Sequence, residues 1–372
     1  MMFPPLDDLA RALATGARTA QDLADEALAR AADPQGEGGR VFVALDPDRT
    51  RAEAQASDLL RRHRIVPSPL AGVPISVKDL FDVVGQPTAA GSRALAGAPA
   101  ERDAPPIARL RAAGAVFTGR TNMTEFAYSG VGLNPHHGTP ANPWDRATGR
   151  IPGGSSSGAA VSVADGMAAA AIGTDTGGSC RIPAALCGIV GFKPTASRIP
   201  LAGCVPLSPS LDSVGCFATT VAGVALVDAV MAGEEPAAPD PTELDGLRIL
   251  VPKTVVLDRM DDEVGRAFER ALARLSQAGV RIVEREVPLL SRLPELAAGG
   301  GIVAAEAYAW HRELLAEADA AADAGIVDLA LLGLRDRRGL HRPEPAPPAQ
   351  SEHRQPARRL RDQPALPRAR RA

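Results

Sequence analysis

The chain has 372 residues, of which 45% are hydrophobic and 23% are charged, and its formal net charge is −3. This is ordinary globular composition, and the near-neutral charge gives no electrostatic reason to expect nucleic acid or an anionic membrane as a partner. The N-terminus lacks the basic and apolar regions of a signal peptide, no apolar run reaches the roughly 18 residues of a membrane span, and the spacing of the four cysteines matches no zinc pattern. We therefore expect a reduced, cytoplasmic protein that needs no metal or cofactor.

The expected elements alternate between helix and strand along the chain. Leucines at near-helical spacing predict an amphipathic helix over residues 6–33, and residues 72–85 contain a short β-like run bounded by glycine. Residues 103–122 indicate a helix, a glycine turn and a buried strand. Residues 129–156 are rich in Gly, Pro, Asn and His, which predicts loops, whereas the small apolar residues 157–173 predict a buried helix.

The same alternation continues in the second half of the chain. Residues 233–246 are polar and rich in Pro and Glu, which is typical of a surface loop or linker. They are followed by a strand "LRILVP", a helix near residues 262–278 and a strand "VRIVEREVP". Helices and strands that alternate throughout predict an α/β fold with a mixed sheet.

Ser155 follows a Gly-Gly pair in "GRIPGGSSSGAAVSVA" and precedes the expected buried helix. The free N–H groups at the start of a helix favour an oxyanion or alkoxide, but an N-cap serine on a structural helix is the more ordinary explanation. The stretch also fits the G-x-S-x-G elbow of α/β-hydrolases. No strand precedes it and few histidines follow it, so we reject the elbow.

A second serine ends the Gly-rich stretch "GTDTGGS" at residues 173–179. Its small residues let the backbone N–H groups of Thr176, Gly177, Gly178 and Ser179 converge on one point, which predicts an oxyanion hole beside a nucleophilic Ser179. A phosphate-binding loop is the competing function, but the chain has no G-x-x-x-x-G-K-[ST] motif. The structural alternative is a Gly-rich turn with a capping serine.

A serine nucleophile needs a base, and because histidines are few, lysine is the candidate. Lys78 lies in the apolar run "ISVKDLF", where burial would lower the pKa of its amine and let it accept a proton. The S-x-x-K motif of β-lactamases is absent. A structural lysine paired with the adjacent Asp79 fits the spacing equally well.

Together these stretches resemble the amidase signature family of serine amidases, which use a Ser-Ser-Lys triad. The resemblance covers roughly residues 1–312 and rests on six motifs in order, namely "GVPISVKDLFDVVG", "GRTNMTEFAYSG", "NPHHGTPANPWD", "PGGSSSGAAVSVA", "GTDTGGSCRIPAALCGIVGFKPT" and "PLSPSLDSVG". It implies an α/β fold with a large mixed β-sheet covered by helices on both faces. The implied domain, residues 1–312, has an N-terminal helical segment (6–33), a catalytic core (65–232) and a following α/β segment (247–312).

The resemblance also implies the roles of individual residues. The implied triad is Lys78, Ser155 and Ser179, with Ser155 after a cis peptide bond; the implied oxyanion hole is Thr176, Gly177 and Gly178; the implied supporting residues are Ser156, Asp175 and Arg181. We further expect Met123, Phe126 and Tyr128 to line the substrate pocket, although aromatic residues in an α/β core are usually just core.

The implied reaction is hydrolysis of a carboxamide to a carboxylate and ammonia through an acyl-enzyme on Ser179. The expected partner is a small-molecule amide, and no nucleic acid or membrane is expected to bind. The sequence does not decide whether the protein forms a homodimer. The family includes the glutamine-hydrolysing subunit of tRNA-dependent amidotransferases, which typically reads R-Q-P-A after the nucleophile and K-P-T-Y-G-R later. This chain reads "CRIPAALCG" and "KPTASRIP", which favours a stand-alone amidase. A non-catalytic member of the same fold is the remaining alternative.

Residues 313–372 depart from the family pattern. From Arg335 to Ala372 the chain has 11 Arg and 7 Pro in 38 residues, which predicts a disordered basic tail. With suitable codons, a one-base shift of the reading frame converts residues 352–367 into N-T-V-N-L-L-D-G-C-A-I-S-L-P-C, similar to the family's late N-x-x-D-x-C-A-I-S-x-P segment. We therefore expect a frameshift between about residue 313 and the Arg-rich start, an incomplete C-terminal part, and low stability and weak or absent activity for the chain as written.

Overall fold

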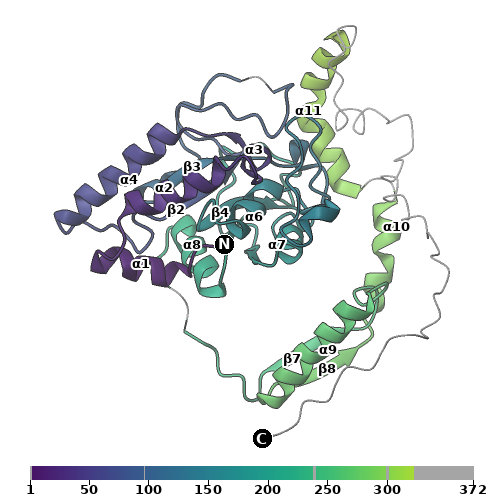
Figure 1. Cartoon of the computed structure of the whole chain (residues 1–372). Helices are drawn as coiled ribbons and strands as arrows, with labels where there is room; N and C mark the ends of the chain where they lie inside the picture. The colour runs from purple at the N-terminus through teal and green to yellow at the C-terminus, as the bar shows by residue number, and fades with distance from the viewer. Residues whose placement is uncertain (1, 96, 238–239, 299–300, 322–372) are drawn as a thin grey trace, which may run out of the picture.

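The computed structural model describes residues 2–95, 97–237, 240–298 and 301–321. They form a mixed six-stranded sheet with its helices and a smaller unit around a separate pair of strands (Figure 1). The expected Arg/Pro-rich tail lies outside the described residues from 322 onward. Its expected start at residue 313 falls inside the helix α11 (Gly301–Ala321).

The large sheet is mixed, as the resemblance implies. Its strands are β1 (Phe42–Ala44), β2 (Pro74–Lys78), β3 (Val116–Thr121), β4 (Ala170–Asp175), β5 (Val190–Phe192) and β6 (Ser213–Ala218), in the spatial order β1-β3-β2-β4-β6-β5. Strand β2 is parallel to both of its neighbours, β3 and β4, whereas the other pairs are antiparallel.

Helices cover both faces of this sheet, which confirms the expected fold class (Figure 1). The helices packed around it are α1 (Leu6–Thr15), α2 (Ala20–Ala31), α3 (Gly38–Val41), α4 (Pro47–Arg62), α5 (Pro105–Ala112), α6 (Ser157–Ala164), α7 (Arg181–Cys187) and α8 (Val221–Ala232). Ile172 and Cys216 pack in an apolar cluster with α1, α2, α5 and α8, whereas their neighbours Ala171 and Phe217 pack with α6 and α7. Because successive strand side chains point to opposite faces, the two clusters lie on the two sides of the sheet.

Two expected helices are shorter in the structure. Residues 6–33 form two helices, because Gly16 ends α1 in the left-handed conformation (φ 74°) and the Thr19 side chain caps α2. Residues 157–173, expected as one buried helix, form α6 and then enter β4. A turn with Gly166 at φ 70° separates them. Periodicity does not distinguish a short buried strand from a buried helix when all residues are small and apolar.

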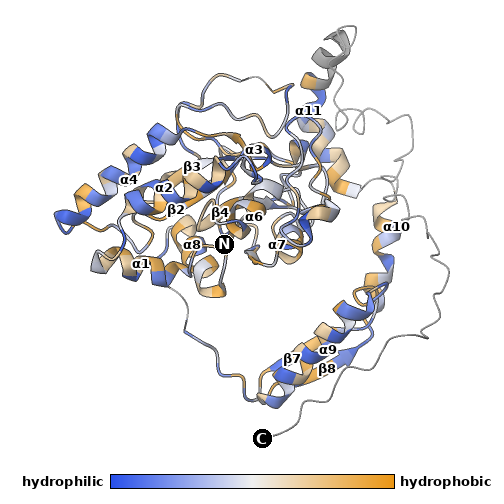
Figure 2. Ribbon diagram, viewed as in Figure 1, coloured by the Kyte–Doolittle hydropathy of each residue, from blue (hydrophilic) through white to orange (hydrophobic). Residues whose placement is uncertain are grey.

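The segment after residue 246 forms a smaller unit. β7 (Arg248–Pro252), α9 (Asp262–Gln277) and β8 (Arg281–Arg285) are the strand, helix and strand that the sequence predicts. The two strands are parallel. α9 buries none of its residues, and Leu250 and Val264 are each 53% exposed. Figure 1 shows this unit apart from the large sheet, with hydrophobic residues along its helix and strands in Figure 2. The short helix α10 (Leu293–Ala297) follows it.

Short 3-10 turns occur at Glu125–Ala127, Arg146–Thr148 and Pro288–Arg292. The second of these is the single helical turn within residues 129–156, so the expected loop-rich character of that segment is confirmed. Within the described ranges, every helix is too short or too polar to cross a lipid bilayer.

Candidate active site

The carboxyl ends of β2 and β4 meet at one edge of the sheet. Because the two strands are parallel, Lys78 at the end of β2 lies close to Thr174 and Asp175 at the end of β4. The start of α6 packs against both strands and brings the serine run 155–157 to the same place. Three motifs that are distant in sequence therefore converge here.

Lys78 is fully buried, and its Nζ donates hydrogen bonds to Ser155 Oγ at 2.8 Å and to Thr174 Oγ1 at 2.9 Å. Burial disfavours the ammonium form and lowers the pKa of Lys78 to about 8. Near pH 8, about half of the molecules therefore carry the neutral amine. The alternative pairing with Asp79 is absent, because the Asp79 carboxylate accepts from Arg120 at 3.3 Å.

Ser155 is fully buried beside this amine. The Gly154–Ser155 peptide bond is cis, as the resemblance implies, and the Ser155 carbonyl accepts from the Thr124 N–H at 2.9 Å. Gly158 lets the start of α6 approach this point closely, since a Cβ there would lie 2.5 Å from the Val41 carbonyl oxygen. Close packing of backbone against backbone thus fixes the position of the serine.

Ser179 follows the end of β4 and is 6% exposed. Its carbonyl accepts from the Ser156 N–H at 3.4 Å, which holds the two serine segments side by side, and Ser156 Oγ donates to the Thr174 carbonyl at 3.3 Å. Across the described part of the chain, no hydrogen bond joins the hydroxyls of Ser155 and Ser179. Hydrogen bonds between catalytic groups often close only when substrate binds, so the arrangement is compatible with a relay.

Asp175 organises the loop around Ser179. Its carboxylate accepts backbone N–H groups from Gly178 at 2.8 Å and Cys180 at 3.0 Å, and the Arg181 guanidinium at 2.8 Å. Burial alone would raise the pKa of Asp175, but Arg181 and the loop N–H groups outweigh it and lower that pKa. The Asp175 carboxylate thus fixes the shape of the turn, and its supporting role in catalysis stays a prediction.

The Gly178 N–H is committed to Asp175, so it is not free for an oxyanion in this structure. The N–H groups of Thr176, Gly177 and Ser179 have no acceptor within the described ranges, and these three remain as candidate donors. Gly178 has φ 135°, a conformation that side chains with a Cβ rarely adopt. The turn itself therefore requires the second glycine of the pair.

Asp212 also contacts the loop, and the sequence did not single it out. The Thr176 hydroxyl donates to its carboxylate at 2.5 Å, and the N–H groups of Leu207 and Ser208 donate to it at 2.9 and 3.1 Å. Asp212 lies in the motif "PLSPSLDSVG". This motif contributes to the family resemblance, but the sequence does not show that Asp212 contacts Thr176. Thr174, which contacts Lys78, likewise lies inside a recognised motif without having been assigned a role.

Helix α11 packs beside the same loops. The Glu306 carboxylate accepts from Ser208 Oγ at 2.5 Å and from the Ser210 N–H at 3.1 Å. Five residues after Glu306, the centroid of the His311 ring lies 4.4 Å from that of the Phe126 ring. Burial lowers the pKa of His311 to about 4. No sequence signal identified Glu306, because it lies outside all six motifs.

The three residues expected to line a substrate pocket lie in or against the main apolar core. Met123 and Phe126 are 0% and 2% exposed, and Tyr128 is partly buried and packs on the same cluster. Core packing, the alternative from the sequence, accounts for the positions of Met123 and Phe126. A role of these side chains toward substrate stays a prediction.

Comparisons with known proteins show which proteins this chain is similar to. The amidase family model matches residues 26–338. The chain is 43% identical over 292 residues to a glutamyl-tRNA(Gln) amidotransferase subunit of Chloroflexus aggregans, and 41% identical over 272 residues to 2-amino-5-chloromuconic acid deaminase of Comamonas testosteroni. These matches cover 74% and 73% of this chain, and 59% of each relative. The chain thus spans about three fifths of the length of these curated relatives.

Solved structures give the same result. An amidase crystal structure superposes with a TM-score of 0.78 at 36% identity, covering 88% of this chain and 73% of that one. The peptide amidase of Stenotrophomonas maltophilia superposes with a TM-score of 0.76 at 31% identity, covering 90% of this chain and 75% of that one. By the family match, the sequence identities and the shared fold, this chain belongs to the amidase family.

Proposed function

We propose that this chain carries the catalytic apparatus of a serine amidase, which converts a small carboxamide to a carboxylate and ammonia. The observation that supports it most directly is the hydrogen bond of 2.8 Å between Lys78 Nζ and Ser155 Oγ. A fully buried lysine with a lowered pKa and a serine as partner is suited to proton transfer. An amine with such a pKa can accept a proton near physiological pH.

In the proposed reaction, neutral Lys78 takes a proton from Ser155 as Ser155 takes one from Ser179. Ser179 Oγ then bonds to the amide carbon, and the carbonyl oxygen becomes an oxyanion facing the N–H groups of Thr176 and Gly177. The proton returns through Ser155 to the amide nitrogen, the C–N bond breaks, and ammonia leaves. Water attacks the acyl-enzyme by the same proton route and releases the carboxylate.

The relatives and the sequence together keep three substrate classes open. The match to an amidotransferase component supports a glutamine-hydrolysing alternative, whereas the "CRIPAALCG" and "KPTASRIP" departures support a stand-alone amidase. The match to a deaminase of a chloromuconic acid adds unsaturated amino acids as a third substrate class to test.

All four cysteines are unpaired, which supports the proposed cytoplasmic location.

Labelling with a fluorophosphonate tests the proposal without knowledge of the substrate. If the triad assembles despite the expected incomplete C-terminal part, the purified 372-residue chain gains the mass of one probe molecule, because such probes react with activated serines. Release of ammonia from glutamine and from simple carboxamides, measured in parallel, separates the two main alternatives. A chain that gains no adduct and releases no ammonia is not a working enzyme as written; the same result after repair of the expected frameshift would favour the non-catalytic member of the fold.

The Asp175 carboxylate, which holds the loop around Ser179, offers a second test. Replacing Asp175 by asparagine is expected to lower kcat about 100-fold, because loss of the charge releases Arg181 and turns an amide N–H₂ group toward loop donors. The matched control is Arg181→Gln, since Arg181 is half exposed and its loss leaves the backbone N–H contacts of Asp175 with Gly178, Cys180 and residue 181 in place. Equal kcat values for Asp175→Asn and Arg181→Gln would contradict a role for the carboxylate in shaping the loop.

A further inference from the structure

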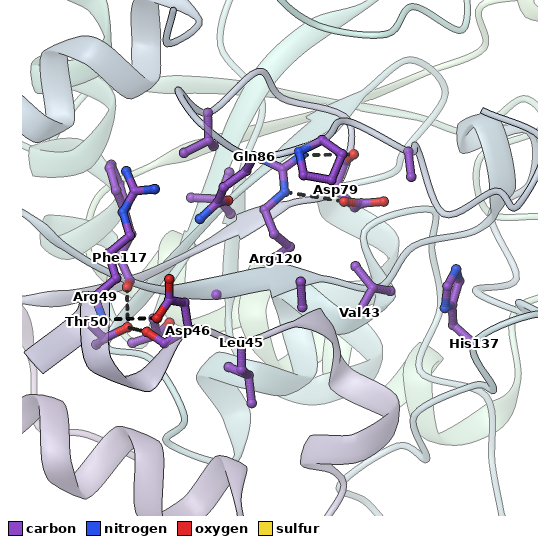
Figure 3. A pocket seen from close by; sticks show the side chains of 17 residues that line it. Val43, Leu45, Asp46, Arg49, Thr50, Asp79, Gln86, Phe117, Arg120 and His137 are labelled. Atoms are coloured by element: carbon purple, nitrogen blue, oxygen red, sulfur yellow. Dashed lines mark hydrogen bonds and ion pairs between the residues drawn. The ribbon is translucent and has the colours of Figure 1, made fainter. Parts of the chain in front are cut away.

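Three aspartates lie in the segments that form the candidate active site, and each is held in a different way. Asp79 forms a buried ion pair with Arg120 at 3.3 Å, at the wall of the cavity drawn in Figure 3. Asp175 is paired with Arg181 at 2.8 Å. Asp212 is only 5% exposed and forms no ion pair among the described residues. Its position therefore depends on the hydrogen bonds of the segment that carries it.

This segment is the turn of residues 207–212. The N–H groups of Leu207 and Ser208 donate to the Asp212 carboxylate at 2.9 and 3.1 Å, and the Asp212 N–H donates to the Ser208 carbonyl at 2.8 Å. The same carboxylate accepts the Thr176 hydroxyl at 2.5 Å. The turn therefore holds the residue whose backbone N–H is a candidate donor to the oxyanion.

Glu306 fastens the turn to helix α11. Its carboxylate accepts hydrogen bonds from Ser208 Oγ at 2.5 Å, from the Ser210 N–H at 3.1 Å and from the Ser210 hydroxyl. These contacts lower the pKa of Glu306, so its side chain is ionised at neutral pH. Hydrogen bonds to an ionised acceptor are stronger than neutral ones, and Ser208 is fully buried. The turn is thus held from both sides, by Asp212 within it and by Glu306 outside it.

We infer that Glu306 is a positioning residue, which fixes Thr176 for the transition state through the turn of residues 207–212. Glu306 makes no hydrogen bond to the triad among the described residues, so its effect passes through that turn. Glu306 has this role only if the chain carries the serine chemistry proposed above. Helix α11 then belongs to the catalytic unit, although it lies outside all six motifs.

The rate constant of fluorophosphonate labelling, followed by intact mass, measures this effect without a known substrate, because the oxygen on phosphorus faces the oxyanion donors. Glu306→Ala is expected to lower the rate constant about tenfold while the final labelled fraction stays that of wild type. A merely damaged fold would lower the labelled fraction instead. Glu313→Ala is the matched control, because the Glu313 side chain lies on the same helix and is 87% exposed; it should label at the wild-type rate.

Glu306→Gln distinguishes positioning from an effect of charge. Its amide oxygen can accept from Ser208 Oγ and from the Ser210 N–H, and its N–H₂ group can donate to the Ser210 hydroxyl. The rate constant of this variant should therefore stay within about threefold of wild type. If Glu306→Gln labels as slowly as Glu306→Ala, the effect comes from the charge and the inference is overturned. An equal rate constant for Glu306→Ala and wild type also overturns it.

Hydrogen exchange followed by mass spectrometry tests the same contact without any reaction. The backbone amides of residues 174–178 should exchange faster in Glu306→Ala than in wild type, whereas Glu313→Ala should match wild type. Unchanged exchange over residues 174–178 in Glu306→Ala would overturn the inference. If wild type gains no adduct, that result counts against a working triad, and the exchange measurement still decides whether Glu306 fixes the segment of Thr176.

Discussion

Replacing Ser179 by alanine is expected to lower kcat/KM for any amide substrate about 10⁴-fold or more and to abolish fluorophosphonate labelling. Without its hydroxyl, no acyl-enzyme forms on this loop, and the remaining groups supply only oxyanion stabilisation and binding. Ser179 is nearly buried and makes its described contact through its backbone carbonyl, so the variant should fold as wild type does. Intact-mass measurement before and after labelling, together with ammonia release, checks both effects.

The matched control is Ser157→Ala. Ser157 belongs to the same serine run and is fully buried, and its hydroxyl has no hydrogen-bond partner among the described residues. Its removal should leave labelling and turnover close to wild type. Persistent labelling of Ser179→Ala would show that another serine is the nucleophile, and loss of labelling in Ser157→Ala would point to a general effect on the fold.

The fold class could be predicted from the sequence because α/β alternation depends on local patterns. Helix α5, strand β3 and the pair β7–β8 each follow from a short run of residues and its flanking turns. Residues 157–173 could not be divided into α6 and β4, because alanine, valine and isoleucine satisfy a buried helix and a buried strand alike. The division is decided by pairing with β2 and β6, which the sequence does not display.

The candidate site was predictable to the extent that its residues lie in Gly-rich motifs. Lys78, Ser155 and Ser179 stand out because unusual neighbours surround each of them. The residues that contact the site loops do not stand out in the sequence, because a contact such as that between Glu306 and Ser208 joins positions 98 residues apart. The sequence also could not show that the Gly178 N–H, one of the predicted oxyanion donors, donates to the Asp175 carboxylate, because this contact forms only in the folded loop.

The C-terminal expectations remain predictions. Helix α11 continues past residue 313, and the amidase family model extends to residue 338. The frameshift that the sequence predicts between about residue 313 and the Arg-rich start stays a prediction. The uncovered apolar side chains of the β7–β8 unit are consistent with the expected low stability. Reading the nucleotide sequence tests the frameshift directly, since codons that cannot encode N-x-x-D-x-C-A-I-S-x-P in the shifted frame exclude it.

Lys78→Met is expected to reduce kcat/KM to a level similar to that of Ser179→Ala, because no other base contacts Ser155 within the described residues. In wild type, kcat/KM should rise about tenfold per pH unit below pH 8 and level off above it, since only the neutral amine accepts a proton. Lys253→Met is the control, because Lys253 is half exposed and lies outside the site; it should leave turnover unchanged. A rate that is independent of pH between 6 and 9 would argue against Lys78 as the base.

The same variant should separate the catalytic cost from the stability effect of the buried lysine. The pKa of Lys78 is about 8 in the folded chain and near 10.5 when the lysine is exposed, so the unfolded state binds more protons between these values. Wild type is therefore less stable than Lys78→Met. This difference in the free energy of unfolding is largest below pH 8 and diminishes as pH rises toward 10.5. Thermal unfolding of both chains from pH 7 to 10.5 measures this difference. A gap in Tm that stays constant over that range would mean that Lys78 titrates alike in both states, and the proposed neutral base would then be wrong.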